Sequence, residues 1–205
     1  MSAPAGRLVL ATRNAHKVEE LRRILAGAGL EFELLSLDAF PDAPEVAETG
    51  ATFAENALLK AHAIAAHTGL PAIADDSGLA VDALNGMPGV LSARWAGPGH
   101  DDRANLELLL SQVSDVPEER RGAQFVCAAV LARPDGAERV VEGVLSGSVT
   151  TAPRGSNGFG YDPVFVPEGE SRTTAELTAA EKDAISHRGI AFRALAAELP
   201  RLLAA

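Results

Sequence analysis

The sequence has few aromatic side chains, a single cysteine and no long apolar run. Aromatic residues make up 4% of the chain and apolar residues 47%, so Ala, Leu and Val must fill the core. The lone cysteine, Cys127, excludes an internal disulfide and fits a reducing compartment. The apolar run around it, residues 125–132, is far shorter than the ~20 residues of a membrane-spanning helix. The apolar run after Arg7 is too brief for a signal peptide, so we expect a cytoplasmic protein that enters no membrane.

Basic residues never gather into a block, and the formal net charge is −10. Because such a chain repels nucleic acids, we expect no nucleic-acid partner. A small anionic ligand is compatible with this charge, since a few Lys or Arg side chains or a metal ion can neutralise one pocket. With about 150 residues per domain as a guide, 205 residues correspond to one large domain or two small ones.

Strand-like and helix-like segments alternate along the first part of the chain. Residues 8–11 and 32–37 read as strands, and the apolar stripe from Val18 to Leu25 predicts a helix that stops near Gly27 and Gly29. A capping-box spacing at 52–55 predicts a second helix, which ends at Gly69. A third helix is predicted from 101 or 102 to 113.

The second half of the chain adds a hairpin and a final helix. Residues 133–136, Arg-Pro-Asp-Gly, separate two strand-like segments and predict a hairpin turn. A second capping box at 178–181 opens a last helix with Ile185, Phe192, Leu195 and Leu199 facing inward. These patterns predict an α/β fold with a mixed sheet, organised as one domain over residues 1–205.

Two adjacent acids, Asp75 and Asp76, follow a short apolar run and precede Ser77 and Gly78. A strand that ends there would hold the acids rigidly, and the glycine would let the backbone turn beside a ligand. Like charges this close repel each other unless a cation or a shared proton offsets them. The alternative is an ordinary turn, since Asp, Ser and Gly are common turn residues.

The first strand leads through residues 12–17 directly into a helix. Thr12, Asn14 and Lys17 add donors and a positive charge to a helix N-terminus, which attracts anions. The segment lacks the glycines and the Gly-Lys-Ser/Thr ending of a Walker A loop. A plain polar turn with Asn14 as the helix cap is the alternative.

Polar residues on the second helix and before it form another candidate group. Asn56 and Lys60 are one turn apart and share a helix face, while Glu45 and Glu48 precede the helix. A solvated helix face is the alternative explanation.

Residues 155–163 place Phe159 and Tyr161 in a glycine-rich loop, although aromatic residues are scarce in this chain. Small residues beside a ring allow a planar ligand to approach and stack, whereas a flexible surface loop is the alternative. On the last helix, Lys182, His187 and Arg188 fall within two turns of one another. Arg188 could bind a carbonyl or a phosphate, or it could form a surface salt bridge.

Taken in order, these segments resemble the inosine triphosphate pyrophosphatase family, which hydrolyses non-standard purine nucleoside triphosphates. The matching stretches span most of the chain: 10–17, 48–57 with 60–61, 74–79, 159–163 and 186–188. One departure is that Ala47-Glu48 stands where relatives often have paired acids before Thr-Gly, which leaves open whether Glu45 assists Glu48. The resemblance implies an elongated mixed β-sheet flanked by helices, two lobes with a central cleft, a homodimer and a requirement for Mg²⁺.

The resemblance also assigns roles to residues of this sequence. Asp76 would be the proton acceptor and, with Glu48, a metal ligand, while Lys17 and Lys60 would neutralise the triphosphate. Ser77 would contact the substrate. The remaining substrate-binding residues would cradle the triphosphate, line the base pocket or reach the base edge: Thr12, Arg13, Asn14, Ala15, His16, Lys17, Phe159, Gly160, Tyr161, Asp162, Lys182, His187 and Arg188.

The implied reaction is attack by water on the α-phosphorus of a purine nucleoside triphosphate, which releases a monophosphate and pyrophosphate. Two other functions are compatible with the sequence. One is a nucleotide-binding module without hydrolysis, and the other is a related hydrolase for pyrimidine or methylated nucleotides. The sequence does not indicate whether inosine or xanthine is preferred or how guanine is excluded.

Overall fold

The computed structural model describes residues 6–27 and 32–204, which divide into two compact units. Unit 1 contains the residues up to 76, 127–143 and those from 188 onward, and unit 2 contains 77–126 and 144–187. The chain passes from one unit to the other within three long strands: β3 (Ala72–Val81), β5 (Gly122–Ala132) and β6 (Glu138–Val149). Whether the chain is a single domain over residues 1–205 stays a prediction.

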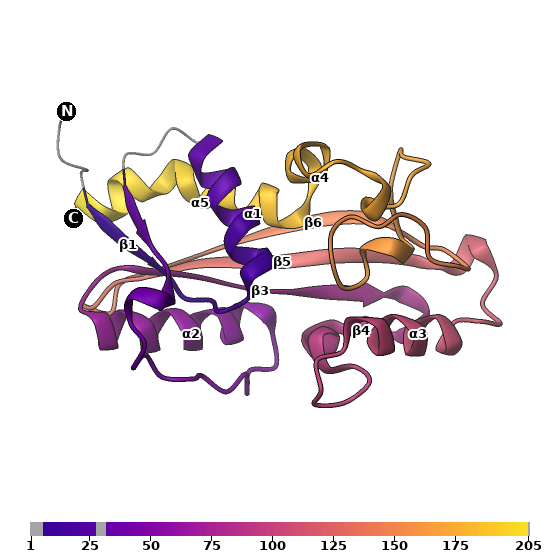
Figure 1. The fold of residues 1–205 in the computed structure, drawn as a ribbon, viewed down its shortest axis with the longest axis horizontal. Helices are drawn as coiled ribbons and strands as arrows, with labels where there is room; N and C mark the ends of the chain where they lie inside the picture. The colour runs from indigo at the N-terminus through magenta and orange to yellow at the C-terminus, as the bar shows by residue number, and fades with distance from the viewer. Residues whose placement is uncertain (1–5, 28–31, 205) are drawn as a thin grey trace. The chain divides into compact units, whose positions relative to one another are not determined.

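In the described part of the chain, the strands form one sheet in the order β2-β1-β3-β5-β6-β7, with β4 paired to β3 (Figure 1). β1 (Arg7–Leu10) is parallel to both β2 (Glu33–Leu35) and β3. β4 (Met87–Pro88) is antiparallel to β3, and β7 (Phe165–Pro167) is antiparallel to β6. The predicted mixed sheet is therefore confirmed.

Unit 1 has helices on both faces of its strands because successive strand residues point to opposite sides. Leu8 and Leu10 face α1 (Ala15–Gly27) and α5 (His187–Ala204), whereas Val9 and Ala11 face α2 (Phe53–Thr68). Figure 1 shows α1 and α5 on one side of these strands and α2 on the other. Small alanines dominate the α2 layer, and they let this helix pack closely on the strands: Ala57, Ala61, Ala65, Ala72, Ala74, Ala128 and Ala132.

Unit 2 has its own apolar core, built around α3 (Asp102–Gln112) and the adjoining strands. Leu109 of α3 and Leu79 of β3 are fully buried in it. Phe125 and Phe165 pack with their ring centroids 4.6 Å apart. α4 (Ala179–Ile185) also belongs to this unit. No helix in the described ranges is both long and apolar enough to cross a membrane.

The helix and turn signals of the sequence are confirmed at four places. Thr52 accepts a hydrogen bond from the backbone of Glu55 at the start of α2, and Gly69 ends that helix in the left-handed conformation. The box at 178–181 caps α4 in the same way. The Arg133 N–H donates to Ala137 at 2.8 Å and closes the turn between β5 and β6. The end predicted for α1 is confirmed at Gly27, while Gly29 lies outside the described residues.

Two predicted elements differ from the structure. The strand expected over 32–37 pairs only at Glu33–Leu35, and a 3₁₀ turn, Leu37–Ala39, follows it. The single last helix is wrong, because Ser186 adopts an extended conformation (φ −63°, ψ 150°) that separates α4 from α5. Serine readily satisfies backbone groups outside a helix, so it is a common break point. Ile185 is only half-buried, whereas Phe192, Leu195 and Leu199 are buried as expected.

Candidate active site

Asp75 and Asp76 lie in the middle of β3, not at its end as the sequence suggested. The strand continues because Leu79 and Val81 are buried in the core of unit 2. Gly78 does not turn the chain there: a Cβ at this position would lie 2.3 Å from the Ser92 Oγ. The glycine therefore permits close packing, and the strand holds both acids on a rigid backbone.

Asp76 is the last residue of unit 1 and is bound by two side chains of α2. Lys60 Nζ donates to Asp76 Oδ1 at 3.1 Å and to Glu48 Oε1 at 3.0 Å. Asn56 Nδ2 donates to Asp76 Oδ2 at 3.2 Å, while Asn56 Oδ1 accepts from the Gly50 N–H at 2.7 Å. Asn56 is fully buried, so the helix face that carries Asn56 and Lys60 is not a solvated one.

Burial raises the pKa of Asp76 above its ordinary value, although the ammonium groups of Lys60 and Lys17 oppose the rise. Burial also acts against the charge of Lys60, but Asp76, Asp75 and Glu48 together raise the pKa of that amine. Lys60 therefore stays positively charged. Asp76 combines a raised pKa with a solvent-shielded position, which suits a carboxylate that must accept a proton.

Asp75 is bound by a different pair of cations, Lys17 and Arg188. Lys17 Nζ donates to Asp75 Oδ2 at 2.9 Å, and Arg188 Nε donates to the same oxygen at 3.2 Å. Burial opposes ionisation, but Lys17 and Arg188 hold the pKa of Asp75 far below its ordinary value. The two neighbouring acids thus differ in chemistry, because cations lower the pKa of Asp75 whereas burial raises the pKa of Asp76.

Glu20 on α1 completes this buried network, and the sequence reasoning did not identify it. Arg188 Nη1 forms a short ion pair with the Glu20 carboxylate, and the Glu20 residue is only 6% exposed. Lys17 and Glu20 are three residues apart on α1, so one helix face supplies both a cation and an anion. The available signal was an acid beside the apolar stripe of a helix, directly before Leu21.

The predicted phosphate cradle at residues 12–17 lies in the same unit and reaches Asp75 through Lys17. Asn14 caps α1, since its Oδ1 accepts the Lys17 N–H at 3.2 Å, and the Asn14 N–H donates to Thr12 Oγ1. Arg13 donates to the Ala43 carbonyl at 2.9 Å. The cradle and the acids are therefore neighbours, with its middle residues exposed to solvent: Arg13, Asn14, Ala15 and His16.

In unit 2, Phe159 is half-buried and Lys182 lies against its ring. The Lys182 ammonium is 5.1 Å from the ring centroid, and it pairs with Asp162 Oδ2 at 2.6 Å. Asp162 also accepts the Phe159 N–H at 2.8 Å and the Thr174 hydroxyl at 2.9 Å. Asp162 is 2% exposed, so this carboxylate organises the loop from inside.

The other predicted residues of unit 2 are largely buried. The Tyr161 hydroxyl donates to the Ser92 carbonyl at 2.8 Å, and burial raises the pKa of Tyr161. The His187 ring stacks on Phe125 at 4.8 Å with an 11° angle between the planes. Ser77 is half-buried and follows Asp76 directly in β3. Tyr161 and His187 thus have packing roles in addition to the predicted roles in binding.

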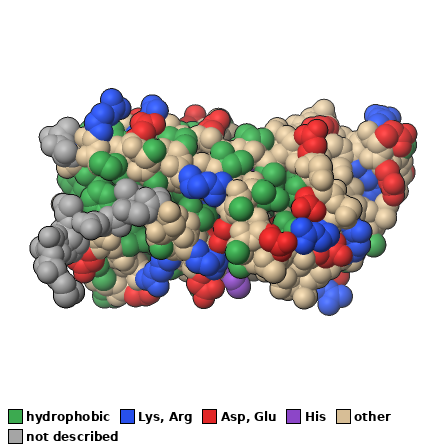
Figure 2. Space-filling model, turned by 90° about the horizontal axis from the view of Figure 1, so that it is seen from above, with side chains coloured by type: hydrophobic (Ala, Val, Ile, Leu, Met, Phe, Trp, Pro, Cys, Tyr) green, Lys and Arg blue, Asp and Glu red, His purple; other side chains and the backbone are tan. Residues whose placement is uncertain are grey.

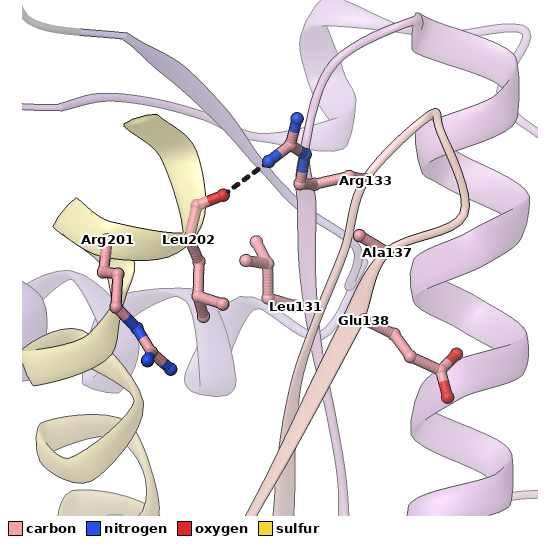
Figure 3. Close-up of a pocket in the computed structure, with 6 residues that line it drawn as sticks. All are labelled: Leu131, Arg133, Ala137, Glu138, Arg201 and Leu202. Carbon is pink, nitrogen blue, oxygen red and sulfur yellow. Dashed lines mark hydrogen bonds between the residues drawn. The ribbon is translucent and has the colours of Figure 1, made fainter. Parts of the chain in front are cut away.

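A pocket of about 330 Å³ lies elsewhere in unit 1 and contains none of the predicted site residues. It is mainly apolar, and Arg133 closes one side by donating to the Leu202 carbonyl at 2.8 Å (Figure 3). Its lining comes from β5, the turn after it, the start of β6 and α5: Leu131, Arg133, Ala137, Glu138, Arg201 and Leu202.

Known proteins resemble this chain over most of its length. The sequence profile of the Ham1 family matches residues 8–198. The chain belongs to the Ham1 family. The resemblance read from the ordered segments is thereby confirmed.

Among its relatives, the dITP/XTP pyrophosphatase of Streptomyces coelicolor is 66% identical over 197 residues, which cover 96% of this chain and 98% of the relative. A dITP/XTP pyrophosphatase of Mycobacteroides abscessus is 59% identical over 197 residues, covering 96% and 94%. The structure of a Ham1 protein from Coxiella burnetii aligns with a TM-score of 0.86 at 41% identity, covering 95% of this chain and 98% of that one.

Proposed function

We propose that this Ham1-family chain hydrolyses non-standard purine nucleoside triphosphates, ITP or dITP and XTP, to the monophosphate and pyrophosphate. Such an enzyme would cleanse the nucleotide pool. The observation that carries the proposal is the convergence of two lysines on adjacent acids: Lys17 on Asp75 at 2.9 Å and Lys60 on Asp76 at 3.1 Å. The names of the relatives, dITP/XTP pyrophosphatases, support the same substrates.

The first turn of α1 would bind the triphosphate. Backbone N–H groups at a helix N-terminus favour anions, and Lys17 adds a full positive charge in that turn. Thr12 and the exposed side chains of residues 13–16 surround the same helix end. Lys17 and Lys60 would offset the negative field that a chain with a net charge of −10 otherwise presents to a triphosphate.

Asp76 would take the proton from the attacking water. Phosphoryl chemistry depends mainly on positioning and charge stabilisation, so a rigid base and fixed cations are the parts it needs. β3 and Asn56 hold the Asp76 carboxylate in place, and burial keeps its pKa raised. Lys60 lies within hydrogen-bond distance of Asp76 and would stabilise the charge that develops on the phosphate oxygens.

Glu48 and Asp76 fit a Mg²⁺ site. Both carboxylates come within 3.1 Å of one cation, the Lys60 ammonium, so they converge on one region. In the described residues no group of three or more His, Cys, Asp or Glu side chains could hold a metal. Mg²⁺ commonly uses one or two carboxylates together with substrate phosphates, which matches this donor set. When bound, Mg²⁺ would supply Lewis-acid stabilisation of the phosphate oxygens.

The predicted base-binding residues would recognise the purine. Phe159 would stack on the purine, and the Lys182 ammonium lies 5.1 Å from the centroid of its ring. Hypoxanthine and xanthine present an acceptor at position 6, where adenine presents a donor. Lys182, His187 and Arg188 would therefore donate to this acceptor of the non-standard bases. The amino group of adenine would instead face another donor.

A product assay tests the proposal. The chain is incubated with ITP, dITP, XTP, GTP and ATP in the presence of Mg²⁺, and the products are separated and identified. Monophosphate and pyrophosphate from ITP, dITP or XTP, with little turnover of ATP, are expected. Activity should disappear with EDTA and return with added Mg²⁺.

Other outcomes of this assay contradict the proposal. Orthophosphate with nucleoside diphosphate would place the cut at another bond, and equal rates on ATP would remove the base selectivity. Saturable binding without product would favour a nucleotide-binding module. Hydrolysis confined to pyrimidine or methylated nucleotides would favour the related hydrolase.

The homodimer, the cytoplasmic location and the absence of a nucleic-acid partner stay predictions. On the face drawn in Figure 2, Lys and Arg side chains stand singly or in small groups among acidic and apolar ones. Sedimentation at several concentrations would test the dimer.

A further inference from the structure

Two carboxylates hold consecutive backbone N–H groups of the loop that carries Phe159. Asp162 accepts the N–H of Phe159 at 2.8 Å, and Asp102 Oδ2 accepts the N–H of Gly160 at 2.9 Å. Asp162 comes from the same loop, whereas Asp102 comes from α3, 58 positions earlier in the chain. Asp102 therefore ties the tip of the loop to a separate element of unit 2.

The loop needs such a tie because glycines give its backbone unusual freedom. Gly158 and Gly160 on either side of Phe159 have φ values of +74° and +59°, a region that glycine enters without steric cost. Residues 151–158 before the ring are exposed. The Tyr161 hydroxyl, which donates to the Ser92 carbonyl at 2.8 Å, is a second link between this loop and the segment 92–102.

Asp102 is not required to cap its own helix. The N-cap of α3 is Asp101, whose side chain accepts the Ala104 N–H at 3.0 Å. The neighbouring Asp102 is an exposed residue in the first helical turn, and its carboxylate reaches Gly160. Asp101 thus caps the helix and Asp102 binds the loop, and each can be changed without removing the other's hydrogen bond.

We propose that Asp102 is a positioning residue for base recognition, because its hydrogen bond to Gly160 fixes the backbone that orients the Phe159 ring toward a purine. This inference rests on the stacking role of Phe159 in the proposed function. Asp102 acts through Gly160 and does not itself touch the base. What it provides is an acceptor at one point, which an amide oxygen can also provide.

The test compares Asp102→Ala, Asp102→Asn and the matched control Asp101→Ala, all in the full chain. Two quantities are measured: hydrogen exchange of the Gly160 amide by NMR, and KM and kcat for ITP. In Asp102→Ala, the exchange rate of the Gly160 amide should rise at least about fivefold. KM should rise about fivefold, while kcat should not change. A fivefold change corresponds to the loss of about one net hydrogen bond. In Asp102→Asn, the Gly160 exchange rate and KM should both equal those of the unaltered chain. Asp101→Ala should lower the unfolding temperature and leave both unchanged.

Three results would overturn the inference. The first is unchanged exchange at Gly160 in Asp102→Ala, and the second is a rise of KM in Asp101→Ala equal to that in Asp102→Ala. The third is a failure of Asp102→Asn to restore the Gly160 exchange and KM, because an acceptor would then not suffice. Absence of hydrolysis by the unaltered chain would instead contradict the proposed function, while the exchange measurement would still decide whether Asp102 holds the loop.

Discussion

Arg188 Nε donates to Asp75 Oδ2 at 3.2 Å, although the two residues are 113 positions apart in the chain. Both side chains are almost completely buried, at 3% and 0% exposed. Arg188 also pairs with Glu20, and Asp75 also pairs with Lys17, so anions and cations alternate along one chain of contacts: Glu20, Arg188, Asp75 and Lys17. Arg188 and Asp75 each have two partners of opposite charge, and Glu20 and Lys17 each have one, so the buried charges are paired, as charges inside a protein must be.

Replacement of Arg188 by Met should strongly destabilise the chain. The variant leaves Asp75 with one cation fewer and Glu20 without its buried partner, and such a break typically costs about 3–5 kcal/mol. Urea denaturation followed by circular dichroism measures the loss. Arg201→Met is the matched control, because the Arg201 side chain is 82% exposed and its removal should change stability by less than about 0.5 kcal/mol. Equal losses in the two variants would contradict the buried network.

Replacement of Asp75 by Asn should make the free energy of unfolding depend less on pH in the acid range. The pKa of Asp75 is lower in the folded chain than in the unfolded one, so its charge stabilises the fold above the unfolded value of about 4. That contribution is lost as the pH falls through this range toward the folded pKa. The free energy of unfolding of Asp75→Asn should therefore start lower at pH 7 and decline less between about pH 4 and pH 2.

Urea midpoints at a series of pH values measure this effect. Asp42→Asn is the control, since the Asp42 side chain is 81% exposed, and it should keep the pH dependence of the unaltered chain. A curve for Asp75→Asn parallel to that of the unaltered chain would show that Asp75 carries no such linkage.

Replacement of Asp76 by Asn should remove turnover but leave nucleotide binding largely intact. The amide cannot accept the proton from water, and loss of a general base lowers kcat by about 100-fold or more. In the proposed function, Lys17 and Lys60 would still bind the triphosphate. Pyrophosphate release measures turnover, and calorimetry with ITP measures binding. Asp135→Asn on the hairpin should retain full activity, and an Asp76→Asn variant within tenfold of the unaltered chain would show that Asp76 is not the base.

Replacement of Gly78 by Ala should destabilise unit 2. The added Cβ would lie 2.3 Å from the Ser92 Oγ and 2.6 Å from the Gly89 carbonyl oxygen, so the backbone must shift. Forced overpacking typically costs about 1–3 kcal/mol. Thermal unfolding checks the loss against Gly99→Ala, where a Cβ meets nothing within 4 Å. If both variants unfold at the same temperature, the close approach at Gly78 does not constrain the strand.

Local sequence patterns determined much of the secondary structure. The capping box at Thr52 and Glu55 fixed the start of α2 because the two side chains bond neighbouring backbone groups. The uninterrupted apolar run from Leu8 to Ala11 indicated a strand buried on both sides, since each side carries apolar residues. The cradle, the acids and Lys60 were also found from sequence, as polar residues beside apolar segments.

Only the tertiary structure decided how the charges are paired. The sequence could not show that Asp75 and Asp76 have opposite environments, because Lys17, Lys60 and Arg188 come from three different helices. The sequence also predicted that the strand ends at these acids, but β3 continues past them. The same residues fit a turn or a continuing strand, and only the packing around Gly78 distinguishes the two. Hydrogen bonds within one turn of a helix join residues that are close in the sequence, so the sequence pattern predicts them. Ion pairs between distant segments form only when the apolar core has brought those segments together.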